Sequence, residues 1–183
     1  MLWLLFLYRH GNKERMSEPG GQAPPDKLVR LPRDMESVPY HTASELKQLL
    51  PGIKQWKFED SRDHALYWQP ALQTADDFCN HSGMMGSMRV LFRTSQIKMF
   101  IPVYTHYYVT RTVRLRGQAT VRAIMRALHD FARKAYAFYI VNDLGQKAYE
   151  NTVSEMMQSL HISRLLCRRT GGSNQVYVEG LKL

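Results

Sequence analysis

The sequence predicts an α+β protein, with an antiparallel sheet of about four to six strands packed against two or three helices and an irregular N-terminal arm. Two observations favour this class. Segments with the two-residue alternation of strands are separated along the chain from segments with helical spacing. Their order is a helix, strands, two helices and two strands, which is typical of an antiparallel sheet rather than a parallel one.

The size of the chain fits one domain. It has 183 residues, of which 44% are hydrophobic, and this is enough for one well-packed core. We therefore expect a flexible or partner-docked arm over residues 1–40 and a single α+β domain over residues 41–183. Residues 28–40 show no periodicity and contain two prolines, so we interpret them as a linker.

The first eight residues form an apolar run. The run is too short for a membrane helix, which needs about 20 residues, and we expect no transmembrane span. It also differs from a signal peptide, because no basic residue precedes it. Two interpretations remain open: a translated extension ahead of a start at Met16, or an arm that docks on a partner. The docking residues would be Leu2, Trp3, Leu4, Leu5 and Phe6.

The first half of the chain contains one clear helix. Residues 42–50 have leucines on one side, and Thr42 or Ser44 is suited to cap the helix N-terminus. Pro51 and Gly52 end it. Residues 53–83 mix aromatic and charged side chains without a sustained period, so we expect irregular structure with a helical turn near residues 74–79.

Alternating apolar residues then predict strands. Residues 90–92 and 97–103 alternate on either side of a short polar stretch, which indicates a hairpin. Pro102 lacks a backbone N–H, so it places the second strand at an edge or ends it. A third alternating strand covers residues 107–116, and Gly117 ends that strand.

Helical spacing returns at residue 120, where Thr120 can cap the N-terminus. Residues 136–143 could continue this helix or form a short strand, residues 146–160 predict a second helix, and residues 162–183 predict a final hairpin around the turn TGGSN. The helix that starts at Thr120 has one apolar face, made of Val121, Ile124, Met125, Leu128, Phe131, Ala132 and Ala135.

Positive charge is concentrated in one stretch. The formal net charge is +9, and residues 111–134 hold seven Lys or Arg against one Asp, while the rest of the chain is nearly neutral. Such clustering is typical of a patch that faces a polyanion or an acidic partner. We call these residues the basic segment: Arg111, Arg114, Arg116, Arg122, Arg126, Arg133 and Lys134.

Arg122 bears on the role of the basic segment. It falls in the first turn of the predicted helix, where the helix dipole disfavours a cation by a few tenths of a kcal/mol. Arg114 and Arg116 could lie near it across the preceding turn. Neighbouring aromatic residues that could stack on bases are Tyr104, Tyr107 and Tyr108. The alternative is that the tyrosines pack in the core or at its rim, and that the arginines are solvated or paired with acidic loops such as residues 59–63.

No motif for catalysis or for a cofactor is found. None of the seven histidines has the spacing of a known catalytic motif, and the glycines near residues 83–87 and 170–174 lack the flanking pattern of a phosphate loop. We interpret the carboxylates of residues 59–64 and of Asp76 and Asp77 as loop charge and helix capping. Zinc-compatible residue types without a recognised spacing are Cys79, His81, His161 and Cys167. We therefore expect no enzyme, no metal and no cofactor.

One stretch resembles a known group of proteins. The run TVRLRGQATVRAIMRALHDF at residues 112–131, followed by VYVEGLKL at the end, is similar to uncharacterised α+β proteins of large double-stranded DNA viruses. The resemblance covers the C-terminal part of the chain and implies a virion or virus-factory protein without a known activity.

Together these features predict a non-enzymatic structural or interaction protein, such as a minor virion component. Its expected partners are other protein subunits. The alternative is a nucleic-acid-binding module that uses the basic segment. Only two cysteines are present, so there is no disulfide framework, and we expect a reducing location in the virion or the host-cell cytoplasm.

Overall fold

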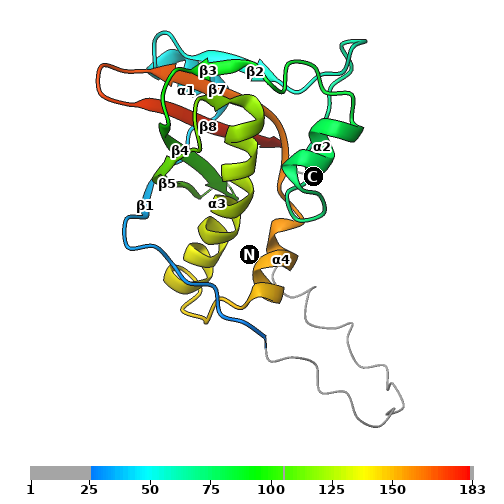
Figure 1. Ribbon diagram of the computed structural model, residues 1–183. Helices are drawn as coiled ribbons and strands as arrows, with labels where there is room; N and C mark the ends of the chain where they lie inside the picture. Colours follow the sequence, from blue (N-terminus) through cyan, green and yellow to red (C-terminus); the bar gives the residue numbers. More distant parts are fainter. Residues whose placement is uncertain (1–25, 105, 182–183) are drawn as a thin grey trace, which may run out of the picture.

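A computed structural model describes residues 26–104 and 106–181 and confirms the α+β class (Figure 1). Its main sheet has six strands in the order β1-β5-β4-β8-β7-β2. The strands are β1 (Glu36–Pro39), β2 (Lys54–Lys57), β4 (Gln96–Val103), β5 (Tyr107–Arg114), β7 (His161–Arg169) and β8 (Asn174–Leu181). Four of the five strand pairs are antiparallel, and β4 pairs with β8 in parallel, so the sheet is mixed but largely antiparallel.

The described residues form four helices, where the sequence predicted two or three. They are α1 (Ala43–Leu49), α2 (Ala75–His81), α3 (Val121–Asn142) and α4 (Glu150–Met157). The additional helix is α2, which the sequence predicted only as a turn. It is short, and Thr74 caps it by accepting a hydrogen bond from the backbone N–H of Asp77 at 3.1 Å.

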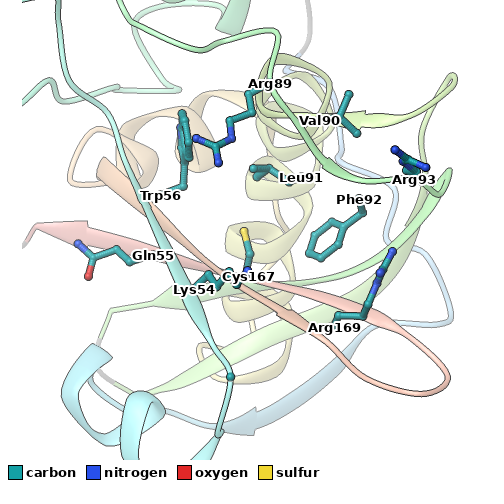
Figure 2. A pocket seen from close by; sticks show the side chains of 11 residues that line it. Lys54, Gln55, Trp56, Arg89, Val90, Leu91, Phe92, Arg93, Cys167 and Arg169 are labelled. Carbon is teal, nitrogen blue, oxygen red and sulfur yellow. The ribbon is translucent and has the colours of Figure 1, made fainter.

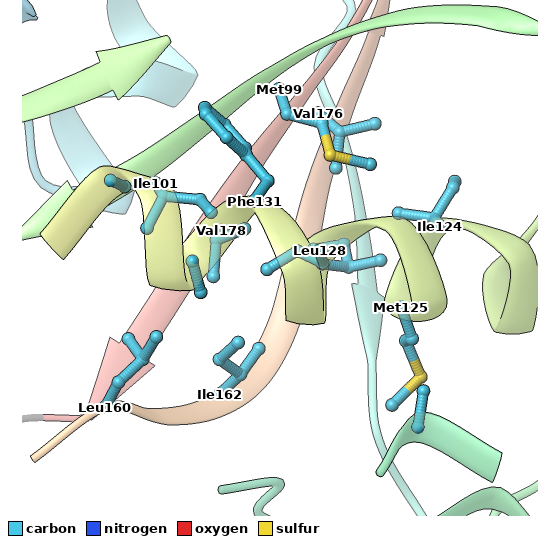
Figure 3. Close-up of a cluster of buried hydrophobic side chains, with 14 of the residues drawn as sticks. Met99, Ile101, Ile124, Met125, Leu128, Phe131, Leu160, Ile162, Val176 and Val178 are labelled. Carbon is cyan, nitrogen blue, oxygen red and sulfur yellow. The ribbon is translucent and has the colours of Figure 1, made fainter. Parts of the chain in front are cut away.

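Helix α3 builds the main core on one face of the sheet (Figures 1 and 3). Thr120 caps it as predicted, accepting a hydrogen bond from the N–H of Ala123 at 3.1 Å. Alternate residues of β4 and β8 point toward it because side chains alternate between the faces of a strand. The residues of this core drawn and labelled in Figure 3 are Met99, Ile101, Ile124, Met125, Leu128, Phe131, Leu160, Ile162, Val176 and Val178.

The opposite face of the sheet carries a smaller aromatic core under α1. Leu46 of α1 packs there with Phe100, Tyr108 and Tyr177 of three neighbouring strands. The rings of Phe100 and Tyr177 stack with centroids 4.1 Å apart. Thr42 and Glu45 form a reciprocal cap at the helix start, as the sequence suggested for Thr42.

The predicted hairpin between residues 90–92 and 97–103 is wrong. β3 (Val90–Phe92) instead pairs with β6 (Ala119–Thr120) in a separate two-stranded sheet. β4 already has β5 along its whole length on one side and β8 on the other, so no edge is left for β3. Pro102 therefore lies in a central strand rather than at an edge. It is beyond the three residues of β4 that pair with β8, so its missing N–H breaks no hydrogen bond to β8.

The linker predicted over residues 28–40 is also wrong, because part of it joins the domain. β1 pairs with β5, and the N–H of Val29 donates to the carbonyl of Ala148 at 2.9 Å. Short edge strands such as β1 carry too few residues for an alternation signal. The proposed docking residues, Leu2, Trp3, Leu4, Leu5 and Phe6, lie outside the described residues.

The structure decides between the two interpretations of residues 136–143 and corrects the bounds of the helix predicted after them. Residues 136–142 continue α3 rather than forming a strand. The predicted helix 146–160 is shorter, because residues 146–148 have no regular secondary structure and α4 covers only Glu150–Met157. Within the described residues, none of the helices is long and apolar enough to cross a membrane.

Candidate functional site

Most of the basic segment is neutralised by carboxylates within the protein. Five of its seven members lie in ion pairs, including Arg111 Nε with Asp34 at 2.9 Å and Arg126 Nη2 with Asp76 at 2.7 Å. The other three pairs are Arg122 with Asp76, Arg133 with Glu150 and Lys134 with Asp130. Only Arg114, the last residue of β5, and Arg116 just beyond it are exposed without an ion pair among the described residues. The seven residues therefore do not form one free cationic patch.

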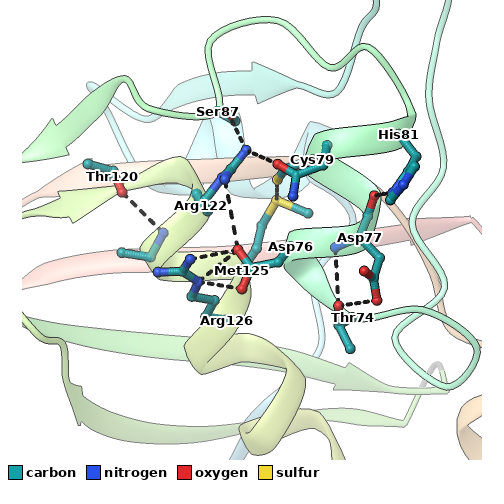
Figure 4. Close-up of polar contacts among 12 residues, drawn as sticks. Thr74, Asp76, Asp77, Cys79, His81, Ser87, Thr120, Arg122, Met125 and Arg126 are labelled. Carbon is teal, nitrogen blue, oxygen red and sulfur yellow. Dashed lines mark hydrogen bonds and ion pairs between the residues drawn. The ribbon is translucent and has the colours of Figure 1, made fainter.

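Arg122 holds three parts of the protein together (Figure 4). Its Nη2 donates to Asn80 Oδ1 of α2 at 2.9 Å, and its Nη1 lies 4.0 Å from Asp76. Its backbone N–H donates to the carbonyl of Ser87 at 2.8 Å, which fixes the loop before β3 against the start of α3. These contacts give a structural reason for a cation in the first helical turn.

Asp76 lies between Arg122 and Arg126. The hydrogen bond from Arg126 and the charges of both guanidinium groups hold the pKa of the Asp76 carboxyl below its ordinary value. The acidic loop 59–63 that the sequence suggested as a partner is used differently, since Asp60 accepts hydrogen bonds from the backbone of Arg62 and His64. The arginines that are paired thus use carboxylates of α2, α4 and other segments.

A different group of cations lines a cleft of about 690 Å³ between β2 and residues 89–93 (Figure 2). No carboxylate lines this cleft. Its basic side chains have no ion-pair partner among the described residues, in contrast to the basic segment. We call them the cleft cations: Lys54, Arg89, Arg93 and Arg169.

Strand register explains why these residues meet. Lys54 of β2 lies opposite Cys167 of β7, so both side chains point to the same face of the sheet. Arg169 follows Cys167 by two residues and shares that face. Arg89 and Arg93 flank β3, which crosses above this end of the sheet, and Figure 2 shows Arg93 and Arg169 on the same side of the cleft.

Trp56 is the more exposed of the two aromatic residues that line the cleft, since the other, Phe92, is buried. The guanidinium carbon of Arg89 lies 4.8 Å from the centroid of its ring, a cation–π contact worth about 0.5–1 kcal/mol at an exposed site. Gly86 packs against the ring, and a Cβ at this position would lie only 2.8 Å from Trp56 Cζ2. The indole Nε1 is buried and has no hydrogen-bond partner among the described residues.

The cleft continues at both ends. Beyond the Trp56–Arg89 stack lies a second hollow of about 540 Å³, which shares Gln55, Trp56 and Arg89 with the cleft. A third hollow of about 650 Å³ shares Arg169 and lies along the β7–β8 turn, residues 170–174. The three hollows thus share lining residues, with Gln55, Trp56 and Arg89 common to the first two and Arg169 common to the first and third.

The tyrosines predicted to stack on bases are engaged elsewhere. Tyr108 is buried under α1 and donates to the carbonyl of His41 at 2.7 Å. Tyr107 donates to Asp143, and Tyr104 packs against Tyr136 with ring centroids 5.8 Å apart. Trp56, which carries the aromatic surface of the cleft, was not predicted.

The zinc-compatible residues do not gather into a site. Cys79 contacts Met125 in the core, and His81 hydrogen-bonds the carbonyl of Asp77. In the part of the chain that the structure describes, no three His, Cys, Asp or Glu residues lie together as metal ligands would. Cys167 at the cleft floor is a poor nucleophile near neutral pH, because burial raises the pKa of its thiol to about 12.

No known protein family matches the chain, and comparison with curated proteins and with solved structures gives no significant match. A function must therefore be argued from the geometry and charge of the cleft itself.

Proposed function

We propose that the protein is a non-enzymatic binding module that holds nucleic acid in the cleft between β2 and β3. The observation that carries the proposal is the set of four cleft cations that face one cavity with no carboxylate among its lining residues. Nucleic-acid binding draws most of its affinity from cations that replace the counterions of the phosphate backbone. Unpaired cations around a hollow supply that interaction directly.

The ion-paired residues of the basic segment are less suited to this role. A phosphate that approaches Arg126 must compete with Asp76, and one that approaches Arg133 must compete with Glu150. An arginine that a carboxylate already neutralises therefore displaces fewer counterions from the phosphate backbone. The alternative predicted from the sequence, nucleic-acid binding, is thus supported by a different surface from the one predicted.

Two triple variants with the same change in charge test this proposal. The cleft triple is Lys54→Gln, Arg93→Gln and Arg169→Gln, and the matched paired triple is Arg111→Gln, Arg126→Gln and Arg133→Gln. Affinity for a labelled single strand is measured by fluorescence anisotropy over a range of salt concentrations. We expect the cleft triple to weaken binding and to reduce the salt slope by about two units, at roughly 0.7 per lost contact, while the paired triple changes little.

The reverse result, with the paired triple losing the affinity, would assign binding to the basic segment. If both triple variants bind as tightly as the parent protein, the cleft is not a nucleic-acid site. The thermal midpoints of both variants are measured as a control, to distinguish a loss of affinity from a loss of folding.

A second candidate is the structural or interaction protein predicted from the sequence, such as a virion subunit. Its specific support is an exposed apolar group next to the cleft: Met85, Met88 and Val90 are 58%, 66% and 41% exposed. Exposed apolar clusters of this kind are typical of protein–protein contacts. Association through them would resist high salt, so light scattering of the parent protein and of Met85→Ser/Met88→Ser in high salt separates this candidate from phosphate binding.

A further inference from the structure

We infer that Trp56 is a base-stacking residue for single-stranded nucleic acid, and that the Arg89 side chain occupies its ring only while the cleft is empty. This inference rests on the proposed function and adds the class of nucleic acid. It follows from the way the ring is held, from the freedom of Arg89, and from the hollows on either side of the pair.

The Trp56 ring is fixed before any ligand arrives. Trp56 pairs with Leu165 in the β2–β7 ladder, and its ring packs against the main core. Gly86 closes one side so tightly that a larger residue would collide with the ring. A preset aromatic surface loses little conformational entropy when a base stacks on it.

Arg89 is held by its backbone and not by its side chain. Its N–H donates to the carbonyl of Gly86 at 2.9 Å, and its carbonyl accepts from the N–H of Val121 at 3.0 Å. The guanidinium has no ion pair with a described residue and only the cation–π contact with Trp56. The side chain can therefore leave the ring without any change in the backbone.

The stacked pair separates two hollows that both lie against it. The cleft of about 690 Å³ and the second hollow of about 540 Å³ share Gln55, Trp56 and Arg89 as lining residues. When Arg89 turns away, the two hollows join above the Trp56 ring. A base then takes the place of the guanidinium, and Arg89 becomes available to a neighbouring phosphate.

This exchange is favourable for chemical reasons. Stacking of a base on an aromatic ring is stronger than a solvent-exposed cation–π contact, and the displaced guanidinium gains a charge-assisted hydrogen bond to phosphate. A duplex cannot make this contact, because its base faces are already stacked on each other, so the site selects single strands.

The test compares Trp56→Leu with Trp56→Phe in binding to a fluorescein-labelled thymidine oligomer and to a duplex of equal length. We expect the parent protein to prefer the single strand, and Trp56→Leu to weaken single-strand binding at least about fivefold without changing the salt slope. Trp56→Phe keeps an aromatic ring, so it should retain most of the affinity. In a Trp3→Phe background, which removes the tryptophan outside the described residues, the protein's own tryptophan emission should be quenched on binding when Trp56 is present and not in Trp56→Leu, since Trp68 is fully buried in the core.

The inference is overturned if Trp56→Leu, folded by circular dichroism, binds the oligomer as tightly as the parent, or if the parent binds the duplex equally well. Either result leaves the proposed function intact as long as the cleft triple has lost affinity. If the cleft triple binds like the parent, the proposed function fails first, whatever Trp56→Leu does. The two failures are therefore distinguishable.

Discussion

Two arginines in neighbouring segments show how partners, rather than charge, decide what a residue does. Arg122 has a hydrogen-bond acceptor in Asn80 and a carboxylate nearby in Asp76, so it fastens α2 to α3. Arg89 has neither and rests on the ring of Trp56 at the rim of a cleft. Both look alike in sequence, because the groups that pair with Arg122 lie more than thirty residues before it.

Gly86 is expected to be required for the position of the Trp56 ring. Its φ of +68° is unfavourable for other residues, and a Cβ would lie 2.8 Å from the ring. Gly86→Ala should therefore lower the free energy of unfolding by more than the 1–2 kcal/mol or so expected for the backbone conformation alone, as measured by denaturant titration.

Gly83→Ala is the matched control for that substitution. Gly83 has nearly the same φ, +69°, but nothing lies within 4 Å of its Cβ position. The difference between the two variants isolates the contact with Trp56. Equal destabilisation by both would show that Gly86 does not position the ring.

Among the secondary-structure elements, α3 was the most predictable. Its apolar face repeats over several turns, and each predicted core residue of that face is buried. β3 and β6 could not be paired from the sequence, because strands of three and two residues contain no register information. β1 escaped prediction for the same reason, and α2 because one short amphipathic stretch between irregular segments resembles a turn.

Leu128 lies at the centre of α3 and is fully buried against the sheet. Leu128→Ala should lower the free energy of unfolding by about 2–5 kcal/mol, because it removes buried methyl groups and leaves a cavity. Asp130→Ala on the exposed side of the same helix should change it by about 0.5 kcal/mol or less. A loss below about 1 kcal/mol for Leu128→Ala in denaturant titration would show that this helix face does not form the core.

The contact between α2 and α3 should depend on pH through Asp76. Arg126 and Arg122 lower the pKa of its carboxyl in the folded protein from the ordinary 3.8, so the folded state favours the ionised form. The resulting stabilisation is fully present at pH values about one unit or more above 3.8. It is lost as the pH falls through the lowered pKa of the folded state.

Asp76→Asn removes the titrating carboxyl, so comparing this variant with the parent protein measures how the contribution of Asp76 to stability depends on pH. The difference in free energy of unfolding between the parent and Asp76→Asn should be constant near neutral pH and should shrink in acid as Asp76 becomes protonated. Because Asp76 is partly exposed, the difference should be small at every pH. A difference that grows on acidification would mean that Asp76 is not held ionised by the two arginines.

For the molecule as a whole, the fold class was predictable and the candidate site was not. The cleft is assembled from β2, the loop before β3 and the end of β7, which lie far apart in the sequence. The wider stretches that contain these segments, residues 1–60, 61–110 and 135–183, are nearly neutral, so a count of charges along the chain points to residues 111–134 instead. Folding pairs the basic segment with carboxylates and leaves the scattered cations together, and only the tertiary structure contains that information.

Cations gathered in a cleft without ion-pair partners should lower the stability of the folded protein. Their arrangement can therefore be tested by stability measurements without any ligand. Lys54, Arg93 and Arg169 face one cavity, so their mutual repulsion opposes folding, whereas Arg111, Arg126 and Arg133 each gain from a carboxylate. Both triple variants lower the formal net charge of +9 by three, so a general effect of net charge would shift them equally.

At low salt we expect the cleft triple to raise the thermal midpoint and the paired triple to lower it, each by a few tenths of a kcal/mol in free energy. Both shifts should shrink near 1 M salt, where the Debye length falls to about 3 Å. Shifts of the same sign at low salt would mean that the cleft cations are not under mutual repulsion, and that their partners lie elsewhere in the chain.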